Sequence, residues 1–196
     1  MTSHQPRKSA QQGRAKATMA AIVEAAARLL ETQGGARLTT NHVAELAGVS
    51  IGTLYQYYPN KEAVIAAVLR REKAALLAGF EDIIARGLGP KSTIDALIDA
   101  TLAHQYTRPR LALALEYIEP ELGLLVEDHA RDRRLVALVA QVVIEVAPDA
   151  DARAAQDLVA ICRAITNTAA MSGETDPTAI APRLHRAVSG YLGLHA

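Results

Sequence analysis

The chain contains no tryptophan, and it has only one phenylalanine and one cysteine among its 196 residues. The single Cys162 excludes an internal disulfide, and we expect the protein to work in a reducing compartment, the cytoplasm. Its six histidines are scattered without metal-ligand spacing, so we expect neither a metal nor a cofactor. No apolar run reaches the roughly 18 residues of a membrane span, and the polar N-terminus lacks the apolar stretch of a signal peptide. We therefore expect no membrane association.

Alanine and aliphatic residues supply most of the 50% of the chain that is hydrophobic. Because alternating β-branched runs are rare, this composition favours helices. The apolar periodicity, read with the glycine and proline breaks, predicts an all-α fold of nine helices and no strand. The predicted helices are Arg14–Gln33, Asn41–Ala47, Ile51–Tyr57, Lys61–Arg86, Thr93–Thr107, a short helix around 111–115, Glu121–Ala147, Ala150–Ser172 and Pro177–Leu194.

The formal net charge of zero hides an uneven distribution. Residues 1–73 carry ten Lys/Arg and five Asp/Glu, whereas residues 74–196 carry eleven and sixteen. A basic first third indicates an end that binds a polyanion such as DNA. The alternative is a basic tail that arose by chance.

Residues 40–57 match a helix-turn-helix, in which two short helices are joined by a turn containing glycine. Gly48 stands at the turn, where the backbone often needs positive φ. Leu54 and Tyr58 lie four residues apart on one helical face, which we expect to pack inward. The second helix would then direct outward a set able to contact base edges or phosphates: Ser50, Ile51, Gly52, Thr53, Gln56 and Tyr57. Helix pairs with glycine turns also occur in plain helical bundles.

Two residues of this segment break local rules. Gly52 lies inside a predicted helix, where glycine costs about 1 kcal/mol relative to alanine. Close approach of DNA or of a neighbouring helix would explain it. Lys61 places a cation in a helix's first turn, against the positive end of the macrodipole, and a docked phosphate would reverse that penalty. The alternative for Lys61 is a side chain that simply extends into water.

The segment LTTNHVAELAGVSIGTLYQYYPNKEAVIAAVL, residues 38–69, resembles the DNA-binding segment of the tetracycline-repressor (TetR) family. The similarity rests on Thr39-Thr40, Val43-Ala44, Ala47-Gly48-Val49-Ser50, Gly52-Thr53-Leu54-Tyr55, Tyr57-Tyr58 and Asn60-Lys61-Glu62. Tyr58 departs from the phenylalanine that the family often has there. The resemblance covers about residues 15–70, and beyond them only the layout of helices is similar.

The resemblance implies a nine-helix TetR-like fold with three parts: a disordered basic arm (1–13), a DNA-binding domain (14–60, recognition helix 51–57) and a ligand-binding and dimerisation domain (61–196). It implies a homodimeric transcriptional regulator, commonly a repressor, that a small-molecule effector releases from palindromic double-stranded operator DNA. By position, the expected phosphate contacts are Thr40, Tyr55, Tyr57 and Lys61. The residues expected at or near base edges are Asn41, Ser50, Ile51, Gly52, Thr53 and Gln56, with Thr53 and Gln56 setting specificity. The arm either follows the DNA or is a solvated tail, and its basic residues are Arg7, Lys8, Arg14 and Lys16.

Apolar stripes on the last two predicted helices are candidates for a dimer interface, since in the family these helices form a four-helix bundle with their symmetry mates. The candidate residues are Leu158, Ile161, Ile165, Ile180, Leu184, Val188 and Tyr191. The alternative is that each stripe faces its own core. The resemblance places an effector site between the middle helices, where the candidates are His104, Tyr117, His129, Arg163, Asn167 and Met171. Each of these could instead be a surface or core residue, and the few aromatics favour an aliphatic or modest-sized effector.

An enzyme is the first alternative class, but the sequence has no GxSxG, phosphate-loop or HExxH pattern. Glu116 and Glu119 are three residues apart, and we interpret them as carboxylates on a solvated helix face. We therefore expect no catalytic activity. The second alternative is a helical small-molecule-binding or adaptor protein without DNA binding, against which the basic first third argues.

Overall fold

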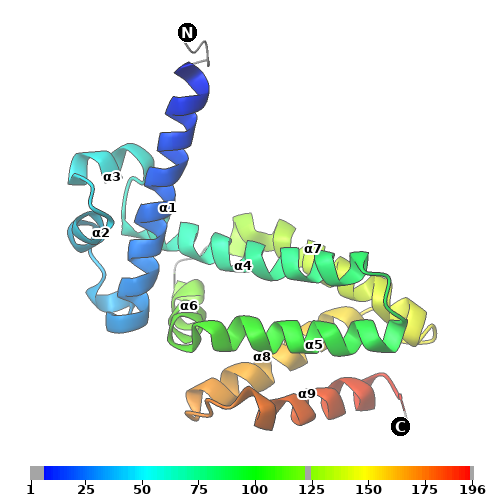
Figure 1. The fold of residues 1–196 in the computed structure, drawn as a ribbon. Coiled ribbons are helices and arrows are strands. Elements are labelled where there is room, and N and C mark those ends of the chain that lie inside the picture. Colours follow the sequence, from blue (N-terminus) through cyan, green and yellow to red (C-terminus); the bar gives the residue numbers. More distant parts are fainter. Residues whose placement is uncertain (1–6, 122–124, 195–196) are drawn as a thin grey trace. The chain divides into compact units, whose positions relative to one another are not determined.

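A computed structural model of the chain describes residues 7–121 and 125–194 (Figure 1). These residues form nine α-helices, one short 3-10 helix (Gly35–Arg37) and no strand, which confirms the predicted all-α fold. The helices are α1 (Arg7–Gln33), α2 (Thr40–Ala47), α3 (Ile51–Tyr57), α4 (Lys61–Ala85), α5 (Pro90–Thr107), α6 (Pro109–Glu121), α7 (Leu125–Val146), α8 (Ala154–Met171) and α9 (Pro177–Tyr191). Within the described ranges, no helix is both long enough and apolar enough to cross a membrane.

The chain divides into two compact units, Met1–Arg70 and Arg71–Ala196. The division falls inside α4, after Arg70 rather than after Asn60, where we expected the domains to meet. The first turns of α4 belong to the N-terminal unit because their apolar residues, Val64 and Val68, are fully buried there.

The N-terminal unit is a small helical bundle in which α2 and α3 lie along one side of α1 (Figure 1). Its core is built from helical-period apolar positions, and the fully buried large side chains are Ile22, Leu30, Leu38, Val43, Leu54, Val64 and Val68. The periodicity therefore predicted the inward faces of these helices correctly.

Helix α1 begins at Arg7, so residues 7–13, which we expected to belong to a disordered arm, are helical in the structure, while residues 1–6 lie outside the described residues. The sequence after Pro6, RKSAQQ, contains no helix breaker, and alanine, lysine, arginine and glutamine are all good helix formers. Gly13 is tolerated as a single helix-interior glycine. The helix thus extends two turns before Arg14, where we expected it to start.

The described residues of the C-terminal unit form a mostly aliphatic core, to which α4, α5, α7, α8 and α9 contribute. Leu158, Ile180, Leu184 and Val188 are buried in this core, and Ile165 packs against it. These five residues therefore face the core of their own chain, and a dimer interface through the last two helices stays a prediction. Ile161 is partly buried, and Tyr191 remains exposed, with its hydroxyl 2.5 Å from an oxygen of Asp157.

Two prolines place helix ends differently from the sequence prediction. Pro90 occupies the first turn of α5, so this helix starts before Thr93. Helix α6 continues through Pro120 to Glu121, beyond the short helix that we expected around 111–115. Asp176 caps α9, since its side chain accepts a hydrogen bond from the backbone N–H of Thr178 at 2.9 Å.

Candidate nucleic-acid interface

The turn between α2 and α3 is fixed by local hydrogen bonds. The Thr39 side chain accepts from the backbone N–H of His42 and caps α2, while Ser50 Oγ accepts from the N–H of Thr53 at 3.0 Å and caps α3. Gly48 ends α2 with φ 68°, a left-handed conformation that glycine adopts without steric cost. These residues confirm the predicted helix-turn-helix connection.

The α3 helix buries one side chain completely and presents most of its other residues to solvent. Leu54 is fully buried, whereas Ile51, Tyr55 and Gln56 are exposed. The hydroxyl of Thr53 lies 2.8 Å from Ser50 Oγ, so it is already engaged in the helix cap. The exposed amide of Gln56 is therefore the α3 group best suited to read a base edge.

Gly52 lies on the exposed face of α3, and the protein's own packing does not require it. A Cβ added to Gly52 would meet only Ser50 Oγ, at an ordinary contact distance of 3.8 Å. No neighbouring helix in the described part of the chain therefore requires a glycine at this position. Of the two explanations that the sequence suggested, a neighbouring helix or DNA, the close approach of DNA remains.

An open hollow of about 360 Å³ lies beside α3, at the N-terminal ends of α2 and α4. Its lining residues are Ala36, Leu38, Thr39, Thr40, Tyr55, Pro59, Asn60, Lys61 and Glu62. The Thr40 and Tyr55 hydroxyls are 3.1 Å apart across the hollow, and they link α2 to α3. Sequence reasoning expected phosphate contacts from Thr40, Tyr55 and Lys61, and the structure brings these three together.

The electrostatics of the hollow favour an anion. The first backbone N–H groups of α2 and α4 carry the positive ends of two helix dipoles. Asn60 caps α4 through its Oδ1, which accepts from the N–H of Ala63 at 2.8 Å. Across the described part of the chain, the ammonium of Lys61 forms no ion pair, so it is available to a phosphate.

The other predicted DNA-facing residues differ in exposure. Asn41 and Ser50 are exposed, and Tyr57 is partly buried. Tyr58, predicted to fill the core, is only partly buried, and its burial raises the pKa of its hydroxyl.

The six predicted effector residues stay a prediction, and those that the structure describes differ in burial. Tyr117 and Met171 are 56% and 61% exposed. Asn167 is partly buried, and the side chain of His129 lies outside the described residues. His104 is partly buried, and burial lowers the pKa of its imidazole despite the nearby charge of Glu72.

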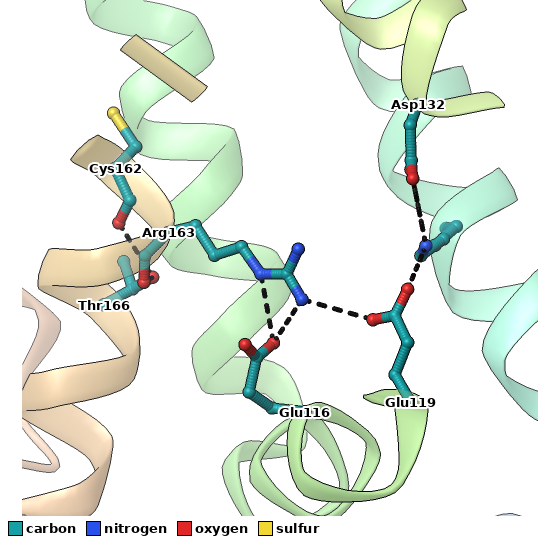
Figure 2. A network of polar contacts seen from close by, with 7 residues as sticks. Glu116, Glu119, Asp132, Cys162, Arg163 and Thr166 are labelled. Atoms are coloured by element: carbon teal, nitrogen blue, oxygen red, sulfur yellow. Dashed lines mark hydrogen bonds and ion pairs between the residues drawn. The ribbon is translucent and has the colours of Figure 1, made fainter. Parts of the chain in front are cut away.

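Arg163 belongs to an ion-pair network that sequence reasoning missed (Figure 2). Its guanidinium donates to Glu116 at 2.8 Å and to Glu119 at 3.2 Å. Burial acts to lower the pKa of Arg163, but the hydrogen bond to Glu116 and the surrounding carboxylates outweigh it and raise the pKa. Glu119 is buried, so our interpretation of it as a carboxylate on a solvated face is wrong.

A second missed residue is Gln105, which continues the buried stripe of α5 after Ile98 and Leu102. Its amide nitrogen is buried and has no hydrogen-bond partner in the described ranges. The signal was present in the sequence, because position 105 shares the helical face of those two apolar residues.

Two family descriptions match most of the chain. Residues 22–68 match "Bacterial regulatory proteins, tetR family", and residues 90–192 match "Tetracyclin repressor-like, C-terminal domain". The first match spans the helix-turn-helix described above, and the second spans α5 to α9.

Curated relatives share part of this chain. It is 30% identical over 77 residues to the HTH-type transcriptional repressor KstR2 of Rhodococcus jostii, covering 39% of this chain and 38% of that one. It is 30% identical over 128 residues to an uncharacterized HTH-type transcriptional regulator of Mycobacterium tuberculosis, covering 65% of this chain and 62% of that one. The chain thus matches less than two thirds of the length of either relative.

Solved structures share the fold over nearly the whole chain. The fatty acid degradation regulator FadR from Bacillus halodurans has a TM-score of 0.77 at 20% identity, over 91% of this chain and 96% of that one. FadR from Bacillus subtilis, solved in complex with stearoyl-CoA, has a TM-score of 0.76 at 21% identity, over 87% and 97%. With both regions matched, the chain belongs to the TetR family of bacterial regulatory proteins.

Proposed function

We propose that the protein is a homodimeric transcriptional repressor that binds a palindromic DNA operator and is released from it by a small-molecule effector. The observation that carries DNA binding is the hollow where Thr40, Tyr55 and Lys61 meet beside the exposed face of α3. Hydroxyls, a lysine and two helix N-termini suit backbone phosphates, which fix the register of a protein on DNA. The name of the relative KstR2 supports repression as the direction of control.

Residues of the interface divide into phosphate contacts and base contacts. Lys61→Ala should weaken binding to all DNA sequences alike and reduce the steepness of its salt dependence, by about one unit in a plot of log affinity against log salt. Gln56→Ala should instead relax the preference at one base position. Fluorescence anisotropy with DNA of varied sequence and salt measures both. If the two variants exchange these effects, the assigned roles are wrong.

One helix-turn-helix presents too little surface for a specific site, so two copies must lie about one DNA turn apart, roughly 34–36 Å. Since the apolar stripes of α8 and α9 are internal, we infer that the second copy packs on their exposed faces. On α8 this face carries small residues at helical spacing, which allow close helix packing, and they are Ala160, Ala164 and Thr168. Met171 extends the same face and is 61% exposed.

A charge placed on this face tests the dimer. Ala164→Arg should convert the dimer into a monomer in light scattering after size-exclusion chromatography, with the helical circular dichroism unchanged. Gln141→Arg, at an exposed position of α7, is the matched control and should remain dimeric. A monomeric wild-type protein, or a dimeric Ala164→Arg variant, would contradict this interface.

Release requires that the effector bind the DNA-incompetent arrangement better than the competent one. The C-terminal unit is where we place the effector, and the unpartnered buried amide of Gln105 supports a polar guest there. A protein of this fold has been solved with stearoyl-CoA, which supports a helical region able to accept a ligand. Measuring the separation of two spin labels on α3 across the dimer, with and without effector, tests this step. Unchanged separation and dynamics would refute it.

A further inference from the structure

Glu119 on α6 is a buried carboxylate held by two cations from different helices. Its side chain is 9% exposed, and Lys73 Nζ on α4 donates to its Oε1 at 2.6 Å. The Arg163 guanidinium on α8 donates to its other oxygen, Oε2, at 3.2 Å. Figure 2 shows the Arg163 guanidinium reaching Glu116 and Glu119.

Each cation also has a second, more exposed acidic partner. Lys73 Nζ lies 3.3 Å from Asp132 of α7, and Arg163 donates to Glu116 of α6 at 2.8 and 3.1 Å. The outer acids hold the two cations in place, so that both point at the same carboxyl group. The five ionised groups together carry a charge of −1.

Stability alone does not account for this arrangement. Bringing charges out of water is costly, and a buried ion pair is often no more stabilising than apolar side chains of similar volume. A registry or switching role is the best-attested reason for keeping such a network. In this chain it ties α6 to α4 through one carboxylate oxygen and to α8 through the other.

We propose that Lys73 and Arg163 form a carboxylate-binding site that Glu119 fills as the protein's own ligand, and that the effector carries a carboxylate which takes its place. This rests on the proposed effector-released repressor. A ligand with one negative charge leaves the local charge unchanged when it replaces Glu119, whereas a phosphate dianion would add a charge beside Glu116 and Asp132. The chemical class is therefore a monocarboxylate.

Displacement of Glu119 has a structural consequence. Once the ligand carboxylate accepts from Lys73 and Arg163, α6 loses its bond to α4 and one of its bonds to α8, while Glu116 keeps α6 paired with Arg163. Lys73 lies on the same continuous helix that begins at Lys61. The site therefore acts on the helix whose first turn belongs to the DNA interface.

Chemical rescue tests the site without DNA. Glu119→Ala removes one methylene and the carboxylate, which together correspond to acetate. The variant should melt at a lower temperature than the wild type, and sodium acetate should raise its melting temperature saturably. Acetamide, or sodium chloride at the same ionic strength, should not. Glu81→Ala, which removes an exposed partner of Arg134, is the control and should show no acetate-specific rescue.

A second variant addresses release and remains useful if Glu119→Ala does not fold. Glu119→Gln keeps the shape of the side chain but no longer competes as an anion. Sodium octanoate should release this variant from DNA at least tenfold more readily than the wild type, and octan-1-ol should release neither. Equal rescue by acetate and chloride, or equal octanoate sensitivity of Glu119→Gln and wild type, would overturn the proposal. Loss of DNA binding by the untreated wild type would instead refute the proposed function.

Discussion

Replacing Gly52 by alanine should make the protein more stable and a poorer DNA binder. An added Cβ meets only Ser50 Oγ at 3.8 Å, so it introduces no clash within the chain. Glycine to alanine at such a helix position should raise the free energy of unfolding by about 0.4–1 kcal/mol, because it reduces the freedom of the unfolded chain.

The same methyl group would stand on the exposed face of α3, where DNA approaches in our account. Inserting a methyl group into a packed interface costs about 1–3 kcal/mol. At about 1.4 kcal/mol per tenfold, this lowers the affinity for DNA by about 5- to 150-fold. The stability gain and the affinity loss thus have opposite signs in one variant.

Urea unfolding followed by circular dichroism measures the stability, and fluorescence anisotropy with a selected DNA sequence measures the affinity. Gly79→Ala in α4 is the matched control, since an added Cβ there meets nothing within 4 Å. It should raise stability in the same way and leave DNA affinity unchanged. The reasoning fails if Gly52→Ala binds DNA as well as the wild type, or if it destabilises the fold.

Three further outcomes follow from particular contacts. Gln105→Met removes an unpartnered buried donor, so the free energy of unfolding should rise by about 1–3 kcal/mol. Gln141→Met, at an exposed site, is the control and should change this free energy little. A loss of stability in Gln105→Met would show that the amide has a hydrogen-bond partner. Ser50→Ala removes the cap of α3 and should lower stability by about 1 kcal/mol in the same assay; an unchanged value would mean that Ser50 does not act as a cap. Burial raises the pKa of the Cys162 thiol to about 11, so the thiol stays protonated at pH 8. It should therefore react with iodoacetamide far more slowly in the folded protein than in the urea-unfolded protein. Equal rates would contradict its burial.

Local signals predicted the helix-turn-helix well. Ser50 and Asn60 cap their helices through bonds that span only three residues, and Gly48 supplies the left-handed turn. Helix caps and turns of this kind depend on residues that are close together in the chain, so the sequence alone predicts them. The convergence of Thr40, Tyr55 and Lys61 followed from the same short segment.

Long-range packing could not be predicted in the same way. The stripe of Ile180, Leu184 and Val188 is equally suited to a partner chain or to its own core, and only the packing of α5, α8 and α9 decides between them. Glu119 looked solvated because its partners lie 46 and 44 residues away in sequence. The helical period predicts which face of a helix is buried, but it does not predict which helix or chain packs against that face.

The most direct test of the account is to select the fragments that the purified protein retains from a pool of random duplex DNA. Two inverted half-sites, with centres about one helical turn apart, should be enriched, because a symmetric dimer presents two α3 helices at that spacing. Retention of fragments without any shared sequence, or of a single unrepeated motif, would contradict a dimer that reads DNA through these helices.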